Sequence, residues 1–199
     1  VNRERSVSKE EVRATLLFLL VMVALLNGMG WFMYRRATNL LEEDLGRHLV
    51  SIGKGVASAL DDGAVEGLAS AAILRGDREP LARERLSSDL ARYLDLYELD
   101  DLTLLSPERV VLAEAGGAAA VGAEHFPLRS SRPPDLDAVI EGEAVHAPLF
   151  TLNGETFKSA YVPVLDRTGD VVAILAVDAS ASFLESARGL RRVLLVVSG

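Results

Sequence analysis

Cysteine is absent from this sequence of 199 residues. The absence excludes a disulfide framework, a thiolate nucleophile, an iron-sulfur cluster and the usual structural zinc sites. Basic residues are also scarce, because 21 Lys and Arg stand against 29 Asp and Glu, which gives a net charge of -8. Such a chain lacks the clustered positive charge that binds nucleic-acid phosphates, so we exclude nucleic acid as a partner.

Common catalytic motifs are missing as well. The sequence contains no phosphate-binding G-x-x-x-x-G-K-[ST], no nucleophile elbow G-x-S-x-G and no zinc-binding H-E-x-x-H. The three histidines, His48, His125 and His146, lie in no metal-ligand spacing. We therefore expect no catalysis within this chain, no metal and no cofactor.

What the sequence does have is apolar residues concentrated in one long run. Although 25% of the residues are charged, the mean hydropathy is +0.22. Residues 14–34 carry no charge and would form about 31 Å of helix, enough to cross a bilayer. Arginines close both ends. We expect a transmembrane helix here and not a cleaved signal peptide, because a signal peptide has a shorter apolar core, whereas this run continues through Trp31-Phe32-Met33 into Tyr34-Arg35-Arg36.

A second apolar run follows Arg191 and Arg192 at the end of the sequence. We expect residues 188–199 to begin a second transmembrane helix that the chain does not complete; the alternative is an apolar tail packed on the domain. Four basic residues precede the first membrane helix and three follow it, which favours a cytoplasmic location for residues 1–13. Residues 35–187 would then form an extracytoplasmic domain.

This intervening region is strongly acidic and begins with helix. Residues 37–187 hold 12 basic and 26 acidic side chains. The negative electrostatic field of this excess disfavours anionic partners. Residues 41–60 carry leucine, isoleucine or valine every three or four positions, which predicts an amphipathic helix that continues from the membrane and ends at Asp61-Asp62-Gly63. Its glycines would permit close packing against a neighbour. A second helix is predicted over 81–97.

From Asp101 the pattern changes to that of strands. Residues 115–142 contain several glycines and prolines and read as a long loop with a short helix near 135–140. Another helix should start at Ser182, where Ser182 and Glu185 form a capping box. The expected strands are residues 102–106, 110–114, 144–152, 156–165 and 171–177.

The segment Ala160-Tyr161-Val162-Pro163-Val164-Leu165-Asp166 through Gly169, with Val171–Asp178, is similar to the "aYxPvxDxxGxvvgvlxvD" hairpin of Cache-type extracytoplasmic sensors. These PAS-like domains lie between two transmembrane helices in bacterial sensor histidine kinases, chemoreceptors and membrane-bound cyclic-dinucleotide enzymes. The resemblance implies an α+β fold with a five-stranded antiparallel sheet in the order 2-1-5-4-3. It also implies a long N-terminal helix behind the sheet, a pocket under the loop between strands 2 and 3, and a location at the bacterial inner membrane.

The same resemblance suggests ligand-binding residues. In family members that bind amino acids and amines, an aspartate at the end of the last strand receives the ligand ammonium, and Asp178 occupies that place. The alternative is that Asp178 caps the following helix. The family also uses an Arg and aromatic cluster for the ligand carboxylate. Here the loop offers Arg129 and Arg132 but no Trp, a departure that counts against an amino-acid ligand.

Three residues inside predicted strands complete the candidate site. Lys158 and His146 would hold a ligand carboxylate if they face the pocket, but strand alternation, which leaves one face in water, favours an outward position for both. Tyr161 belongs to the Cache-like hairpin and either touches a ligand or packs in the core.

Together these features predict a ligand-sensing input domain of a membrane receptor. The ligand would be an amino acid, an amine or a carboxylate, and the output, beyond this chain, a histidine kinase, a chemoreceptor or a cyclic-dinucleotide enzyme. We expect a homodimer, through the stripe at 41–60 and the membrane residues Ala24, Asn27 and Gly28. The alternatives are a bitopic inner-membrane assembly or docking protein of a secretion or division machine, and a membrane-tethered hydrolase.

Overall fold

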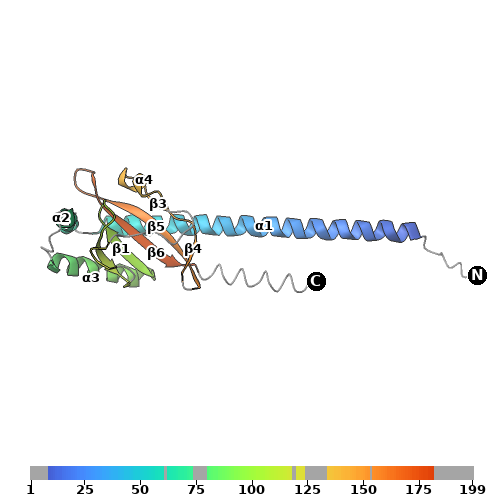
Figure 1. Cartoon of the computed structure of the whole chain (residues 1–199), viewed down its shortest axis with the longest axis horizontal. Helices are drawn as coiled ribbons and strands as arrows, with labels where there is room; N and C mark the ends of the chain where they lie inside the picture. Colours follow the sequence, from blue (N-terminus) through green and yellow to red (C-terminus); the bar gives the residue numbers. More distant parts are fainter. Residues whose placement is uncertain are drawn as a thin grey trace, which may run out of the picture. The chain divides into compact units, whose positions relative to one another are not determined.

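The computed structural model describes residues 9–60, 62–73, 80–117, 120–123, 134–152 and 154–181. The chain divides into two compact units, Val1–Leu41 and Glu42–Gly199. Helix α1, Lys9–Ala57, begins in the first unit and ends in the second. All other helices and strands of the described chain belong to the second unit (Figure 1).

The first unit carries the apolar run. Within the described residues, Arg13–Ala57 is the one helix long and apolar enough to cross a membrane; its most apolar window has a mean hydropathy of 2.2 and no buried residue. The amide of Asn27 donates to the carbonyl of Val23 at 2.8 Å, so this polar group is satisfied inside its own helix. The predicted second membrane segment, 188–199, lies outside the described residues.

Two further helices follow α1. Helix α3, Pro80–Tyr97, confirms the predicted helix over 81–97. Helix α2, Asp62–Ile73, was not predicted. The sequence Asp61-Asp62-Gly63 was interpreted only as the end of a helix, but Asp is also a preferred residue at a helix start. Val65 and Leu68 of α2 are buried against the rest of the second unit.

The sheet is antiparallel and confirms the predicted order. Its strands run β2-β1-β6-β5-β3, and β4 pairs with β5 beside β3. The predicted strand 144–152 is divided in two, because residues 147–149 leave the ladder between β3 and β4. The strands are β1 Asp101–Leu105, β2 Val111–Ala115, β3 Val145–His146, β4 Phe150–Leu152, β5 Glu155–Leu165 and β6 Val171–Ser180.

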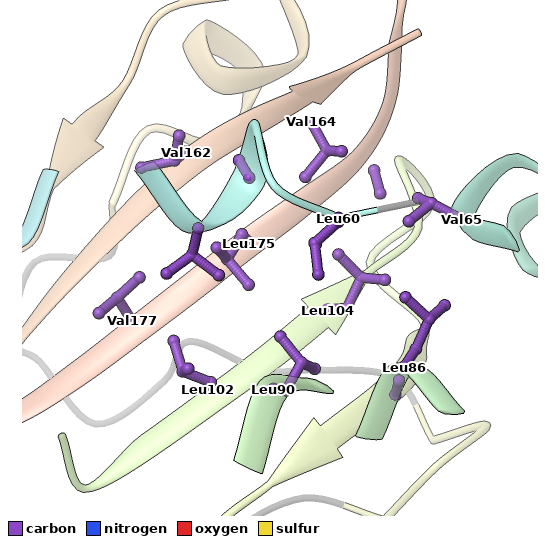
Figure 2. Close-up of a cluster of buried hydrophobic side chains, with 14 of the residues drawn as sticks. Leu60, Val65, Leu86, Leu90, Leu102, Leu104, Val162, Val164, Leu175 and Val177 are labelled. Carbon is purple, nitrogen blue, oxygen red and sulfur yellow. The ribbon is translucent and has the colours of Figure 1, made fainter. Parts of the chain in front are cut away.

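One face of the sheet packs against α1, α2 and α3 to form the main core. Figure 2 shows Leu60 and Val65 lying among strand residues such as Leu104 and Leu175, with Leu90 of α3 beside Leu102. Part of the stripe at 41–60 that we expect to mediate dimerisation therefore packs against the chain's own sheet, since Leu49, Val56 and Leu60 are buried in this core, whereas Leu41 is 45% exposed.

The opposite face carries a smaller apolar cluster. Helix α4, Leu136–Ile140, confirms the short helix predicted near 135–140, and Asp135 caps it by accepting a hydrogen bond from the Ala138 amide at 3.2 Å. Leu136 and Val139 pack there with residues of β1, β2, β5 and β6. This face, which α1 does not cover, carries the polar residues described next.

Candidate functional site

Two aspartates lie directly opposite each other in the middle of the sheet. Asp101 of β1 pairs in register with Asp178 of β6. Their neighbours Leu102 and Val177 point into the core with α1. Because side chains alternate along a strand, both aspartates point to the other face, the face that carries α4. The two aspartates are far apart in the sequence, but antiparallel pairing of the first and last strands brings them together.

Two hydroxyl groups hold these carboxylates. Thr103 Oγ1 donates to Asp101 Oδ2 at 2.9 Å, and the Ser159 side chain, on the β5 residue opposite Asp178, hydrogen-bonds to that aspartate. Asp101 is 7% exposed, and Asp178 is partly exposed with a buried Oδ1. The Oδ1 atom of each has no hydrogen-bond partner, although buried carboxylate oxygens normally have one.

The surroundings of the pair favour its protonated form. Burial is the main cause that raises the pKa of Asp101 to about 7, against the Thr103 hydrogen bond, and the charges of Asp178 and Glu114 raise it further. Burial likewise raises the pKa of Asp178 to about 6, although Ser159 lowers it, and the charge of Asp100 contributes to the rise. Removing a carboxylate from water disfavours its ionised state, and adjacent negative charges add to this cost.

This arrangement suits a cation. Unpartnered carboxylate oxygens can accept charge-assisted hydrogen bonds from an ammonium group. The site is less suited to a metal ion, because the described residues contain no group of three or more His, Cys, Asp or Glu side chains arranged to bind one. The backbone of this region is already paired, since the Asp100 amide donates to the Asp178 carbonyl at 3.0 Å. The hydrogen-bond acceptors that lack a donor are therefore the oxygens of the carboxylates.

Tyr161 lies on the same face of β5 as Ser159, two residues along the strand. It is buried in the apolar cluster with Leu136 and Val139, and burial raises the pKa of its hydroxyl, as does the charge of Asp178. The structure thus brings Tyr161 together with Asp178. It also packs the tyrosine ring in the core, as one of the two interpretations expected, whereas contact with a ligand stays a prediction.

Lys158 and His146 lie on the opposite face of the sheet from Asp178. Lys158 is 1% exposed, so it does not face outward, and its Nζ lies 3.1 Å from Glu42 Oε1 of α1. His146 Nε2 lies 3.5 Å from Glu43 Oε1 of the same helix, with Gly46 packed against its ring. Both basic residues join the sheet to α1, and neither lies beside the aspartate pair.

The remaining candidates have different outcomes. Arg129 and Arg132 lie outside the described residues. Asp178 is not the cap of a helix, since β6 continues to Ser180. The sequence does not indicate Asp101 as a site residue. Only the register of β1 on β6 shows that it is the partner of Asp178.

No protein-family sequence model matches the chain, and no curated protein is detectably similar to it in sequence. Solved structures are similar in fold. The sensor domain of Escherichia coli DcuS superposes with a TM-score of 0.52 at 10% identity, over 74% of this chain and 96% of that one. The sensory domain of the Campylobacter jejuni chemoreceptor Tlp3 with isoleucine bound gives a TM-score of 0.50 at 10% identity, over 77% of this chain and 59% of that one.

These likenesses establish the fold. The second unit has the Cache-type, PAS-like fold of extracytoplasmic sensor domains, as the hairpin at 160–178 indicated. The chain spans nearly the whole DcuS sensor domain but little more than half of the Tlp3 one.

Proposed function

We propose that residues 35–187 are the extracytoplasmic ligand-sensing input domain of a bacterial membrane receptor, which the helix at 14–34 anchors in the membrane. The domain would be coupled to a cytoplasmic output, and a histidine kinase is the output that we favour. The observation that carries the proposal is the unpartnered Oδ1 of Asp178, on the sheet face not covered by α1 in a sensor fold. Its elevated pKa marks it further, because strongly perturbed titratable groups concentrate at functional sites.

The ligand in this proposal carries an ammonium group. Asp178 would accept its hydrogen bonds, and Ser159 on the adjacent strand would orient the carboxylate. Binding stabilises the arrangement of β1, β5 and β6 that fits the ligand. It therefore shifts the domain's population from one conformation toward another. The N-terminal helix is a candidate to carry this shift, since α1 contains both the membrane segment and buried core residues.

Thermal shift of the full chain in detergent micelles tests the proposal, with separate panels of amino acids, amines and dicarboxylates. We expect a member of the first two panels to raise the melting temperature, because a ligand at 100 times its dissociation constant adds about 2.7 kcal/mol to stability. Asp178→Asn should abolish that shift. Asp89→Asn, at an exposed position on α3, is the matched control and should retain it. Stabilisation by dicarboxylates alone, or an unchanged shift in Asp178→Asn, would reject the site.

The proposed membrane topology has a direct test, because the natural chain contains no cysteine. A single Asp89→Cys substitution gives one thiol on the sensor domain. We expect a membrane-impermeant maleimide to label it in cells whose outer membrane has been permeabilised, without lysis of the inner membrane. Labelling only after the inner membrane is lysed would place the domain in the cytoplasm and overturn the proposal of an extracytoplasmic sensor.

A further inference from the structure

We propose that Asp101 and Asp178 together hold a proton in the empty site and release it to solvent when an ammonium group binds, so that the domain responds to amine and to pH together. This inference rests on the proposed sensing function and deepens it. It adds Asp101 to the site and assigns the ligand class as an organic ammonium ion.

The geometry of the pair is the first argument. Residues directly opposite in an antiparallel pair have Cβ atoms about 4.5–5.5 Å apart, and like charges at such positions repel. Asp101 and Asp178 are opposite in this way and face the same side of the sheet. Each also keeps one buried oxygen without a hydrogen-bond partner. Two ionised carboxylates in this position lack a counter-charge, and a proton or a bound cation would supply it.

The neighbouring charges do not supply that counter-charge. Among the described residues, the charged groups that act on the pair are acidic: Asp100 beside β1 and Glu114 on β2. From β5 the pair faces the neutral side chains of Ser159 and Tyr161. Lys158, although adjacent to Ser159 in sequence, points to the other face and pairs with Glu42. The raised pKa values of both aspartates agree with this arrangement.

The nature of the cation follows from the number of ligands. A divalent metal ion needs six or more oxygen ligands, or a tetrahedral set. The described residues contain no cluster of three or more side chains that could hold one. An ammonium group needs only two or three acceptors, and the Asp178 carboxylate can provide part of that set. Asp178, being partly exposed, would contact the ligand, while the buried Asp101 beside it on β1 would respond through the shared proton.

A definite pH dependence follows. If one proton leaves as one ammonium ion binds, the apparent affinity falls about tenfold for each pH unit below the pKa of the pair, and levels off above it. Because burial raises the pKa of Asp101 to about 7 and that of Asp178 to about 6, this change falls near neutral pH. An ordinary exposed aspartate would show the same effect only near pH 4.

The test uses the full chain in detergent with butylamine and 1,4-diaminobutane as probes and 1,4-butanediol as the uncharged control. Calorimetric titration at about pH 6.5, in two buffers with different ionisation enthalpies, measures protons released per amine bound. We expect roughly 0.5–1 proton, an affinity that rises from about pH 5 to about pH 7.5, and no binding of the diol.

The variant Asp101→Asn separates this inference from the proposed function. Asparagine keeps the shape of the side chain and an acceptor for Thr103, but cannot take part in the proton exchange. We expect this variant to bind the amine with at least a twofold smaller pH dependence and fewer protons released, while Asp89→Asn behaves as the natural chain. Amine binding with no proton release in the natural chain would overturn the inference and leave the sensor function standing. If neither amine binds at any pH, the inference fails. The proposed sensing function is then tested by the thermal-shift panels of amino acids, amines and dicarboxylates.

Discussion

Lys158 of β5 and Glu42 of α1 form an ion pair between the sheet and the helix, with Nζ and Oε1 3.1 Å apart. The lysine is 1% exposed, whereas the glutamate side chain is 30% exposed and also accepts a hydrogen bond from the Leu149 amide. One carboxylate thus holds the sheet and the segment between β3 and β4 against the helix. The charge of the lysine is compensated by this contact.

The first prediction concerns this ion pair. Glu42→Gln should lower the free energy of unfolding by about 3 kcal/mol, because it leaves an uncompensated buried ammonium group. Lys158→Met should cost no more than about 1 kcal/mol, because an apolar side chain of similar volume replaces the lysine. Asp44→Asn, at an exposed ion pair on the same helix, should change stability by less than about 0.5 kcal/mol. Chemical denaturation of the three variants measures these differences; equal effects of Glu42→Gln and Asp44→Asn would show that the pair is unimportant.

Two glycines of α1 provide a second prediction. A Cβ atom at Gly53 would lie 2.7 Å from Val162 Cγ2 and 3.1 Å from Val177 Cγ2, so Gly53→Ala should destabilise the fold by about 1–3 kcal/mol. A Cβ at Gly55 would meet nothing within 4 Å, so Gly55→Ala should stabilise it by about 0.5–1 kcal/mol through helix propensity. Melting temperatures of both variants test this difference in sign. Two variants that shift in the same direction would contradict the close packing of α1 on β5 and β6.

The third prediction concerns stability as a function of pH. Asp101 has a pKa of about 7 in the folded chain against an ordinary value of 3.8, so the folded state binds the proton more tightly than the unfolded state. The resulting stabilisation is complete below about pH 4 and is lost as the pH rises to about 7. At 1.36 kcal/mol per pKa unit it amounts to roughly 4 kcal/mol at most. Denaturation at several pH values should show this loss in the natural chain and a flatter profile in Asp101→Asn; parallel profiles would rule out the raised pKa.

The fourth prediction compares two adjacent glycines at the end of β2. Gly116 has a φ of +125°, and a Cβ there would lie 2.6 Å from Asp101 Oδ1. Gly117 has a φ of +76° with nothing within 4 Å of its Cβ position. Gly117→Ala should cost about 1 kcal/mol through backbone strain alone. Gly116→Ala should cost more and also displace the Asp101 carboxylate, which an altered pH dependence of stability would reveal. Equal costs and unchanged pH profiles would argue against the contact.

Much of this fold follows from local sequence patterns. The apolar period of three to four residues gives α3 and the end of α1. The turn at Asp166–Asp170 separates β5 from β6, and Asp166 Oδ1 accepts hydrogen bonds there from the amides of Thr168 and Asp170. Helix α2 was missed because its starting residues were assigned to the end of the preceding helix. The hairpin at 160–178 indicated both the fold and Asp178.

The rest of the site depends on pairing between distant residues. Asp101 became a site residue only when β1 was placed beside β6, since the two aspartates are 77 positions apart and no local pattern fixes this register. Lys158 shows the converse. Its basic side chain in a strand suggested a pocket or an outward position, but a carboxylate on α1, more than a hundred residues earlier in the chain, allows it to lie in the core.

Strand β5 places Lys158 and Ser159 side by side in sequence but on opposite faces, one joined to α1 and the other to Asp178. A single-residue insertion before this point would move the lysine to the position opposite Asp178, and a single-residue deletion would move the serine to the position that meets Glu42. The middle of β5 should therefore tolerate changes of side chain far better than any change of length, in contrast to the loops at the sheet edges. Among related genes, gaps in an alignment are expected to avoid this strand altogether.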